Sequence, residues 1–166
     1  SDAQDALQGG LSLVDAKEAL DREISFSTAK QALDFLLPLA RVKESETENL
    51  SLSEAGEAHV IGLSFSFAHQ ALDLNLTFSD ARNANAFGLN AEEAKIALHL
   101  GMSESEMADH MGSGGTLQSL LEKDASDAGI EVNYFLEASL YDLNASRARE
   151  AYACLLYTSP SPRDGL

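Results

Sequence analysis

Cysteine, proline and tryptophan are scarce in this chain, which has one cysteine, three prolines and no tryptophan among 166 residues. A single cysteine cannot form a disulfide within the chain or make up a cysteine-ligated zinc site. Long apolar runs are missing too, since no stretch approaches the roughly 20 apolar residues that a membrane-spanning helix requires. The sequence therefore excludes an internal disulfide framework and a transmembrane segment.

Positive charge is also scarce, because 11 lysine and arginine residues stand against 27 aspartate and glutamate residues, which gives a net charge of -16. A surface of this charge repels phosphate backbones and anionic lipids, so we expect neither nucleic-acid nor membrane partners. Basic proteins or cations are the favoured partners. The hydrophobic content of 45% indicates a folded chain rather than a disordered one.

The last segment, residues 154–166, matches a translated sequencing-library adapter. The run Cys-Leu-Leu-Tyr-Thr-Ser-Pro-Ser-Pro-Arg-Asp is encoded in frame by a transposase mosaic end and its read-through. We therefore exclude this segment, with Cys154, from the fold, as an artefact of metagenomic or transcriptomic origin. The chain also begins at Ser1 without an initiator methionine, so we expect a truncated fragment. Without Cys154, no thiolate is left for catalysis.

A 13-residue period organises the rest of the chain. One aliphatic column recurs at this interval and continues after a two-residue shift in a glycine-rich segment. The column consists of Leu11, Ile24, Leu37, Leu50, Leu63, Leu76, Leu89 and Met102, followed by Leu117, Ile130 and Leu143. Two further columns, five and eight positions later, consist mostly of alanine. Such an interval predicts a tandem array of repeats.

Each repeat predicts one helix of about ten residues, too short to be stable alone in water. The residue after the aliphatic column is usually Ser, Thr or Asn, which cap helix N-termini. Ser51 with Glu54, and Ser103 with Glu106, match the capping box. Many repeats close with glycine or asparagine, such as Gly62, which tolerate the left-handed conformation at a helix C-terminus.

These signals predict an all-α fold, an α-solenoid-like tandem array of short capped helices. We expect a lead-in at 1–10, a helical array over 11–111, a glycine-rich register break at 112–116 and further helical repeats over 117–153.

A β-solenoid is the alternative architecture. Residues 63–67 and 72–78 alternate apolar and polar side chains with a period of two, as half-buried strands do. The centres of the repeats favour helices instead, because runs such as 91–98 are rich in Ala, Glu and Lys, which form helices readily and strands poorly.

One stretch resembles an EF-hand. Residues 124–134 are similar to a calcium loop running into its exit helix, and residues 91–111 are similar to the segment that joins two such loops. The resemblance implies calcium binding. Its candidate metal ligands are Asp124, Ser126, Asp127 and Glu131. The loop is one residue longer than in the family, and Ala128 stands where a ligand is needed.

No set of residues points to catalysis. The four histidines, at 59, 69, 99 and 110, occupy different repeat positions, and none forms the i, i+4 pair that binds metals on a helix. The glycines at 112–115 lack the Lys-Ser/Thr of a phosphate-binding loop. His110 replaces alanine in a core column, so we expect it to be partly buried. We expect no catalytic residue and no cofactor.

The functional hypothesis is a non-enzymatic repeat protein that acts as a protein-binding scaffold or structural element. Its function would reside on a surface formed across several repeats, and its partner would be a protein, with basic proteins favoured, or the array itself through self-association. Two alternatives remain open: a divalent-cation binding protein with an EF-hand-like segment, and a non-catalytic fragment of a larger enzyme.

Overall fold

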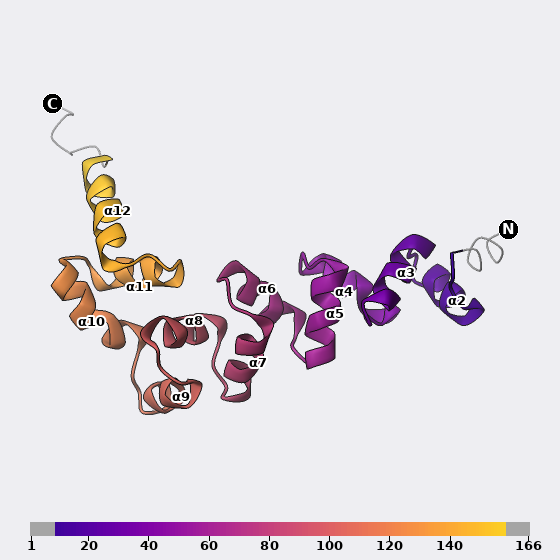
Figure 1. The fold of residues 1–166 in the computed structure, drawn as a ribbon, viewed down its shortest axis with the longest axis horizontal. Helices are drawn as coiled ribbons and strands as arrows, with labels where there is room; N and C mark the ends of the chain where they lie inside the picture. The colour runs from indigo at the N-terminus through magenta and orange to yellow at the C-terminus, as the bar shows by residue number, and fades with distance from the viewer. Residues whose placement is uncertain (1–8, 159–166) are drawn as a thin grey trace. The chain divides into compact units, whose positions relative to one another are not determined.

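The structure, a computed structural model, describes residues 9–158 (Figure 1). These residues form α-helices, one short 3-10 helix and turns, without a strand. The prediction of an all-α fold is confirmed, and the β-solenoid alternative is disfavoured. The alternation at 63–67 spans an N-cap and the first turn of a helix, where no strand forms. Most of the lead-in (1–8) and the end of the adapter segment (159–166) lie outside the described residues.

The chain separates into two compact units, residues 1–83 and 84–166. The described helices of unit 1 are α2 (Leu13–Asp21), α3 (Phe26–Asp34), η1 (Leu39–Arg41), α4 (Val42–Thr47), α5 (Leu52–Ile61) and α6 (Phe65–Asp73). Helix α7 (Phe78–Ala86) contains the boundary. The helices of unit 2 are α8 (Ala91–Leu100), α9 (Glu104–Gly112), α10 (Leu117–Ala128), α11 (Val132–Leu140) and α12 (Ala145–Thr158). Within residues 9–158, no helix is long and apolar enough to cross a membrane.

Most of the described helices begin at side-chain caps, with η1, α4 and α11 as the exceptions. In α5 the backbone N–H of Glu54 donates to Ser51 Oγ at 3.3 Å, and the N–H of Ser51 donates to Glu54 Oε2 at 2.8 Å. The same reciprocal capping box joins Ser103 and Glu106 at the start of α9. Each box satisfies backbone donors that the first helical turn leaves without partners. Both predicted capping boxes are therefore confirmed.

Apart from the direct junction of η1 with α4, each connection between the described helices passes through one residue with positive φ. These residues are Glu23, Leu36, Asn49, Gly62, Asn75, Gly88, Gly101, Gly114, Gly129 and Asp142. The following residue closes the preceding helix, as where the N–H of Leu63 donates to Ala58 O at 2.9 Å. Leu63 is also buried, with 2% of its surface exposed. One aliphatic residue thus ends one helix, enters the core and precedes the cap of the next.

Leu36 occupies this left-handed position with φ of 60° and an exposed side chain. Left-handed backbone costs an L-residue roughly 1–2 kcal/mol, which glycine avoids at some cost in chain entropy. We therefore expect Leu36→Gly to raise the free energy of unfolding by about 0.5–1 kcal/mol. Urea unfolding followed by circular dichroism measures the change. Gly62→Ala is the reverse test, because φ is 77° there and a Cβ would meet no atom within 4 Å, so only the backbone conformation penalises the alanine. A gain in stability from this change would contradict a cost of left-handed backbone at these positions.

The core is built from the aliphatic column and from fully buried alanines. Residues Ala19, Ala29, Ala32, Ala55, Ala58, Ala68 and Ala71 each have 0% of their surface exposed in unit 1. Small side chains let neighbouring helix axes approach closely. One such close approach is at Gly56 in α5, where an added Cβ would collide with the carbonyl oxygen and Cβ of Phe35. Alanine and glycine therefore position these helices as much as the larger aliphatic residues do.

The structure departs from the predicted register after α9. Thr116 caps α10 and Leu117 is the first residue of that helix, so Gly115 takes the place before the cap that had been assigned to Leu117. The two additional residues lie in α10, which has 12 residues where α9 has nine. The physical reason is His110, whose half-buried imidazole fills the space beside Gly115 that an aliphatic side chain would need.

Candidate functional site

The four predicted metal ligands do not form a calcium loop. Asp124, Ser126 and Asp127 lie on α10, and Glu131 is the residue before α11. A calcium loop needs a non-helical backbone that turns successive ligands towards one ion, whereas side chains two apart on a helix point away from each other. In the part of the chain that the structure describes, no three His, Cys, Asp or Glu residues are placed to hold a metal. The expected loop conformation is therefore replaced by helix over 124–128.

We accordingly expect calcium to leave the chain unchanged. Adding calcium at a few millimolar should shift neither the helical circular-dichroism signal nor the midpoint of thermal unfolding by more than about 1 °C, because a ligand stabilises a fold only through binding to it. Magnesium at the same ionic strength is the control. A rise of several degrees with calcium alone would show that α10 rearranges into a binding loop.

Asp124 and Asp127 nevertheless share one face of α10, because they are three residues apart. This face borders a hollow of about 550 Å³ in unit 2, between the end of α8, α10, α11 and the start of α12. Its apolar lining comes from Ala128, Phe135 and Ala145. Phe135 and Ala128 are buried, with 4% and 5% of their surfaces exposed. The hollow therefore combines an apolar lining with an acidic rim.

Arg149 of α12 is the cationic residue of the hollow, and protein carbonyl groups already bind it. Its Nε donates to Ala128 O at 2.6 Å, and its Nη2 donates to Asp127 O at 3.4 Å. These carbonyls lie at the C-terminus of α10, where the helix dipole attracts a cation. Neither carboxylate, of Asp124 or of Asp127, has a hydrogen-bond or ion-pair partner among residues 9–158. Two exposed carboxylates are thus left to face solvent at the rim.

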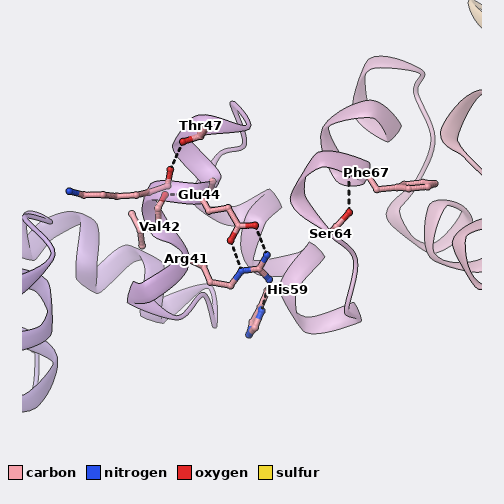
Figure 2. Close-up of polar contacts among 9 residues, drawn as sticks. Arg41, Val42, Glu44, Thr47, His59, Ser64 and Phe67 are labelled. Atoms are coloured by element: carbon pink, nitrogen blue, oxygen red, sulfur yellow. Dashed lines mark hydrogen bonds and ion pairs between the residues drawn. The ribbon is translucent and has the colours of Figure 1, made fainter.

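A second polar cluster centres on Arg41 in unit 1 (Figure 2). Its Nε and Nη2 each donate to an oxygen of Glu44 at 3.0 Å, and its Nη1 lies 3.2 Å from His59 Nδ1. The guanidinium carbon lies 3.8 Å from the centroid of the Phe65 ring, a cation-π contact. Because arginine cannot accept a hydrogen bond, His59 Nδ1 is the acceptor. Arg41 therefore fastens η1 and α4 to α5 and α6, and its donors serve the fold.

Three glutamates have pKa values below the ordinary value of 4.5. The hydrogen bond from the Arg41 guanidinium lowers the pKa of Glu44, the Ser51 hydroxyl lowers that of Glu54, and the Ser103 backbone N–H lowers that of Glu106. A carboxyl group whose pKa is lowered by folding stabilises the fold above its ordinary pKa. This contribution is lost as the pH falls through the lowered value.

The lowered pKa of Glu54 predicts how the capping box of α5 responds to acid. At pH 7 we expect Glu54→Ala to be less stable than the unmodified chain by about 0.5 kcal/mol, since it loses the bonds to Ser51 and the charge near the helix N-terminus. The difference should narrow as the pH falls below 4.5, because the protonated Glu54 loses part of the same interaction. Urea unfolding at pH 7, 5 and 3.5 measures it. A difference that widens in acid would contradict this assignment.

The sequence identified part of the hollow and missed the rest. Asp124 and Asp127 were candidates, but only as calcium ligands. Phe135 and Arg149 belong to other helices, and no spacing along the chain places them beside Asp124. For Arg149 a signal existed in the sequence, because a basic residue recurs at intervals of 13 residues, as in Lys17, Lys30 and Lys43.

Comparison with known proteins adds no family to this description. No protein-family model matches the chain, and a search of curated proteins finds no match. The structure therefore defines the class only as a protein of short helices.

Proposed function

We propose that this chain is a non-enzymatic repeat protein, with an α-solenoid-like array of short helices, that serves as a protein-binding scaffold or structural element. The observation that carries the proposal is the recurrence of helix starts. With η1 and the adjoining α4 counted as one helical segment, segments begin at Leu13, Phe26, Leu39, Leu52, Phe65, Phe78, Ala91, Glu104 and Leu117, and then at Val132 and Ala145. Successive starts are 13 residues apart except for the one interval of 15 that spans the long α10.

Contacts between alternate helices support a stacked array. Gly56 of α5 meets the backbone of Phe35 at the end of α3, and Lys43 Nζ lies 3.4 Å from Glu23 Oε2 after α2. In unit 2, Arg149 of α12 likewise binds the C-terminus of α10. In each case the fifth residue of a helical segment, with η1 and α4 counted as one, touches the end of the segment two before it. Such repeated local contacts stabilise solenoids, in which each repeat touches mainly its neighbours.

The polar groups of the core support a structural use. The buried polar residues of the described chain are Ser45, Lys95 and Ser139. Ser45 Oγ donates to Val42 O at 2.7 Å, and Ser139 Oγ donates to Phe135 O at 2.8 Å. Lys95 is paired with Asp142. These groups are satisfied by partners within the fold, as a structural role requires.

Exposed apolar side chains support a role in binding. In unit 1, Val14, Leu36 and Val60 have 76%, 69% and 60% of their surfaces exposed. In unit 2, Leu98 and Tyr141 have 56% and 63% exposed. Exposed apolar side chains mark a binding surface where they gather into one patch, so the proposal expects a bound partner to cover several of these residues of one unit together.

The test is to select a displayed random-peptide library against the full chain and to measure its self-association by sedimentation. We expect either enrichment of related peptides that bind the folded chain and not its heat-unfolded form, or concentration-dependent oligomers. Peptide binding would support the scaffold, and oligomers would support the structural element. Absence of both would contradict the proposal.

A further inference from the structure

We propose that the hollow of unit 2 binds a lysine or arginine side chain of a basic partner protein. The inference rests on the proposed protein-binding function. It names the binding site and the chemistry of the partner group. The hollow is defined by its apolar residues Ala128, Phe135 and Ala145, by the carboxylates of Asp124 and Asp127, and by Arg149.

The apolar lining suits the stem of a long basic side chain. Lysine and arginine carry three or four methylene groups below the charge, and these pack on apolar surface while the charged end remains near water. The exposed methyl group of Ala145, together with the small parts of Phe135 and Ala128 that reach the hollow, offers such a surface. A volume of about 550 Å³ is within the range of protein ligand sites and has room for one such side chain and the backbone beside it.

The charges select a cation. Asp124 and Asp127 project from one face of α10 without partners in the described chain, so a basic group can pair with them without displacing an existing ion pair. Arg149 does not neutralise them by contact, because its guanidinium bonds to the carbonyl oxygens of Asp127 and Ala128. The net charge of -16 would also speed the approach of a basic partner.

Other ligands fit the same hollow less well. An anion would have to approach the N-terminus of α12, but Asn144 Oδ1 already accepts the N–H of Arg147 there at 3.0 Å, and both carboxylates would repel it. A metal ion would need a third ligand, which the described residues do not place there. The smaller hollow of about 270 Å³ in unit 1 already contains Lys43, paired with Glu23. Of these two hollows, only the larger one presents two unpaired carboxylates above an apolar lining.

The experiment measures fluorescence anisotropy of a labelled, acetylated and amidated decapeptide of alternating lysine and alanine against the full chain at 150 mM salt. A peptide of alternating glutamate and alanine is the negative control. We expect binding of the lysine peptide, and we expect Asp124→Asn with Asp127→Asn to weaken it by about fivefold to tenfold, as two partly exposed ion pairs would. Ala145→Leu, which fills the lining without changing charge, should weaken it as well.

The matched control removes the same charge elsewhere. Glu46→Gln with Glu57→Gln neutralises two exposed carboxylates of unit 1 and should weaken binding less than about twofold. Equal weakening by both double variants would show attraction to overall charge alone, and it would overturn the site, as would a lysine peptide that does not bind. Selected peptides that are not basic, or that bind the aspartate variant equally well, would overturn the inference and leave the protein-binding function standing.

Discussion

Replacing Gly56 with alanine should lower the free energy of unfolding by about 1–3 kcal/mol, which is the usual cost of overpacking a core. The new Cβ would collide with the carbonyl oxygen of Phe35 and with the Cβ of that residue. Neither atom is the free end of a flexible side chain, so α3 and α5 would have to move apart. The measurement is urea unfolding followed by the helical signal.

The sign of the stability change at Gly56 separates helix propensity from packing. In an exposed helix interior, alanine is more stable than glycine by about 1 kcal/mol, so propensity alone predicts that Gly56→Ala stabilises α5. Gly112→Ala is the matched control, because Gly112 lies in the last turn of α9 and a Cβ there would meet no atom within 4 Å. We expect the control to be neutral or stabilising. A Gly56→Ala chain as stable as the unmodified one would contradict the close approach of α3 and α5.

The sequence predicted the helices because their ends are marked by local chemistry. A cap such as Ser51 or Ser103 is bonded to a backbone N–H only three residues away, so the signal lies within one turn. The left-handed residues were only partly predicted. Glycine and asparagine, and aspartate at Asp142, favour this conformation, whereas Glu23 and Leu36 adopt it without any preference for it. At those two positions the flanking helices impose the turn.

The predicted register was wrong after α9 because the sequence interrupts two of the columns there. Gly115 lacks the aliphatic side chain of its column, and His110 lacks the alanine of its own, so two columns break together. The structure explains both exceptions by one exchange, in which the ring of His110 occupies the space that Gly115 leaves open. The imidazole Nε2 lies 3.1 Å from Thr116 O, which can only accept, so Nε2 carries the proton. A compensating pair of this kind is visible only when the two residues are known to touch.

The candidate site was predicted less well than the helices for a related reason. Asp124 and Asp127 were assigned to a loop from the order of their residue types, but α10 continues to Ala128. The packing of α12 against the end of α10 then brings Arg149 beside Asp127 across 22 residues of sequence. Contacts between helices that are two apart in the chain, such as α10 and α12, therefore determine which side chains meet at the surface. The 13-residue interval in the sequence does not specify these contacts.

Removing the carboxylate of Asp142 should have the largest effect on unit 2. Lys95 in α8 has only 3% of its side chain exposed, and its Nζ donates to Asp142 Oδ2 at 2.7 Å. Asp142 follows α11 at one of the left-handed positions, with φ of 58°. Asp142→Ala would leave a buried ammonium group without its partner, so we expect a loss of about 2–3 kcal/mol in the free energy of unfolding. Urea unfolding followed by the helical signal measures the loss.

A double-mutant cycle separates the charge from the backbone. Asp142→Asn keeps a hydrogen-bond acceptor and a residue that tolerates positive φ, so it should lose only about 1 kcal/mol. Lys95→Met removes the ammonium group and keeps the apolar stem. Because the methionine introduced there needs no partner, the further loss from Asp142→Ala in that background should fall to about 1 kcal/mol, the cost of alanine in left-handed backbone. Full additivity of the two changes would show that the pair contributes nothing, and that Asp142 matters to unit 2 only through its backbone.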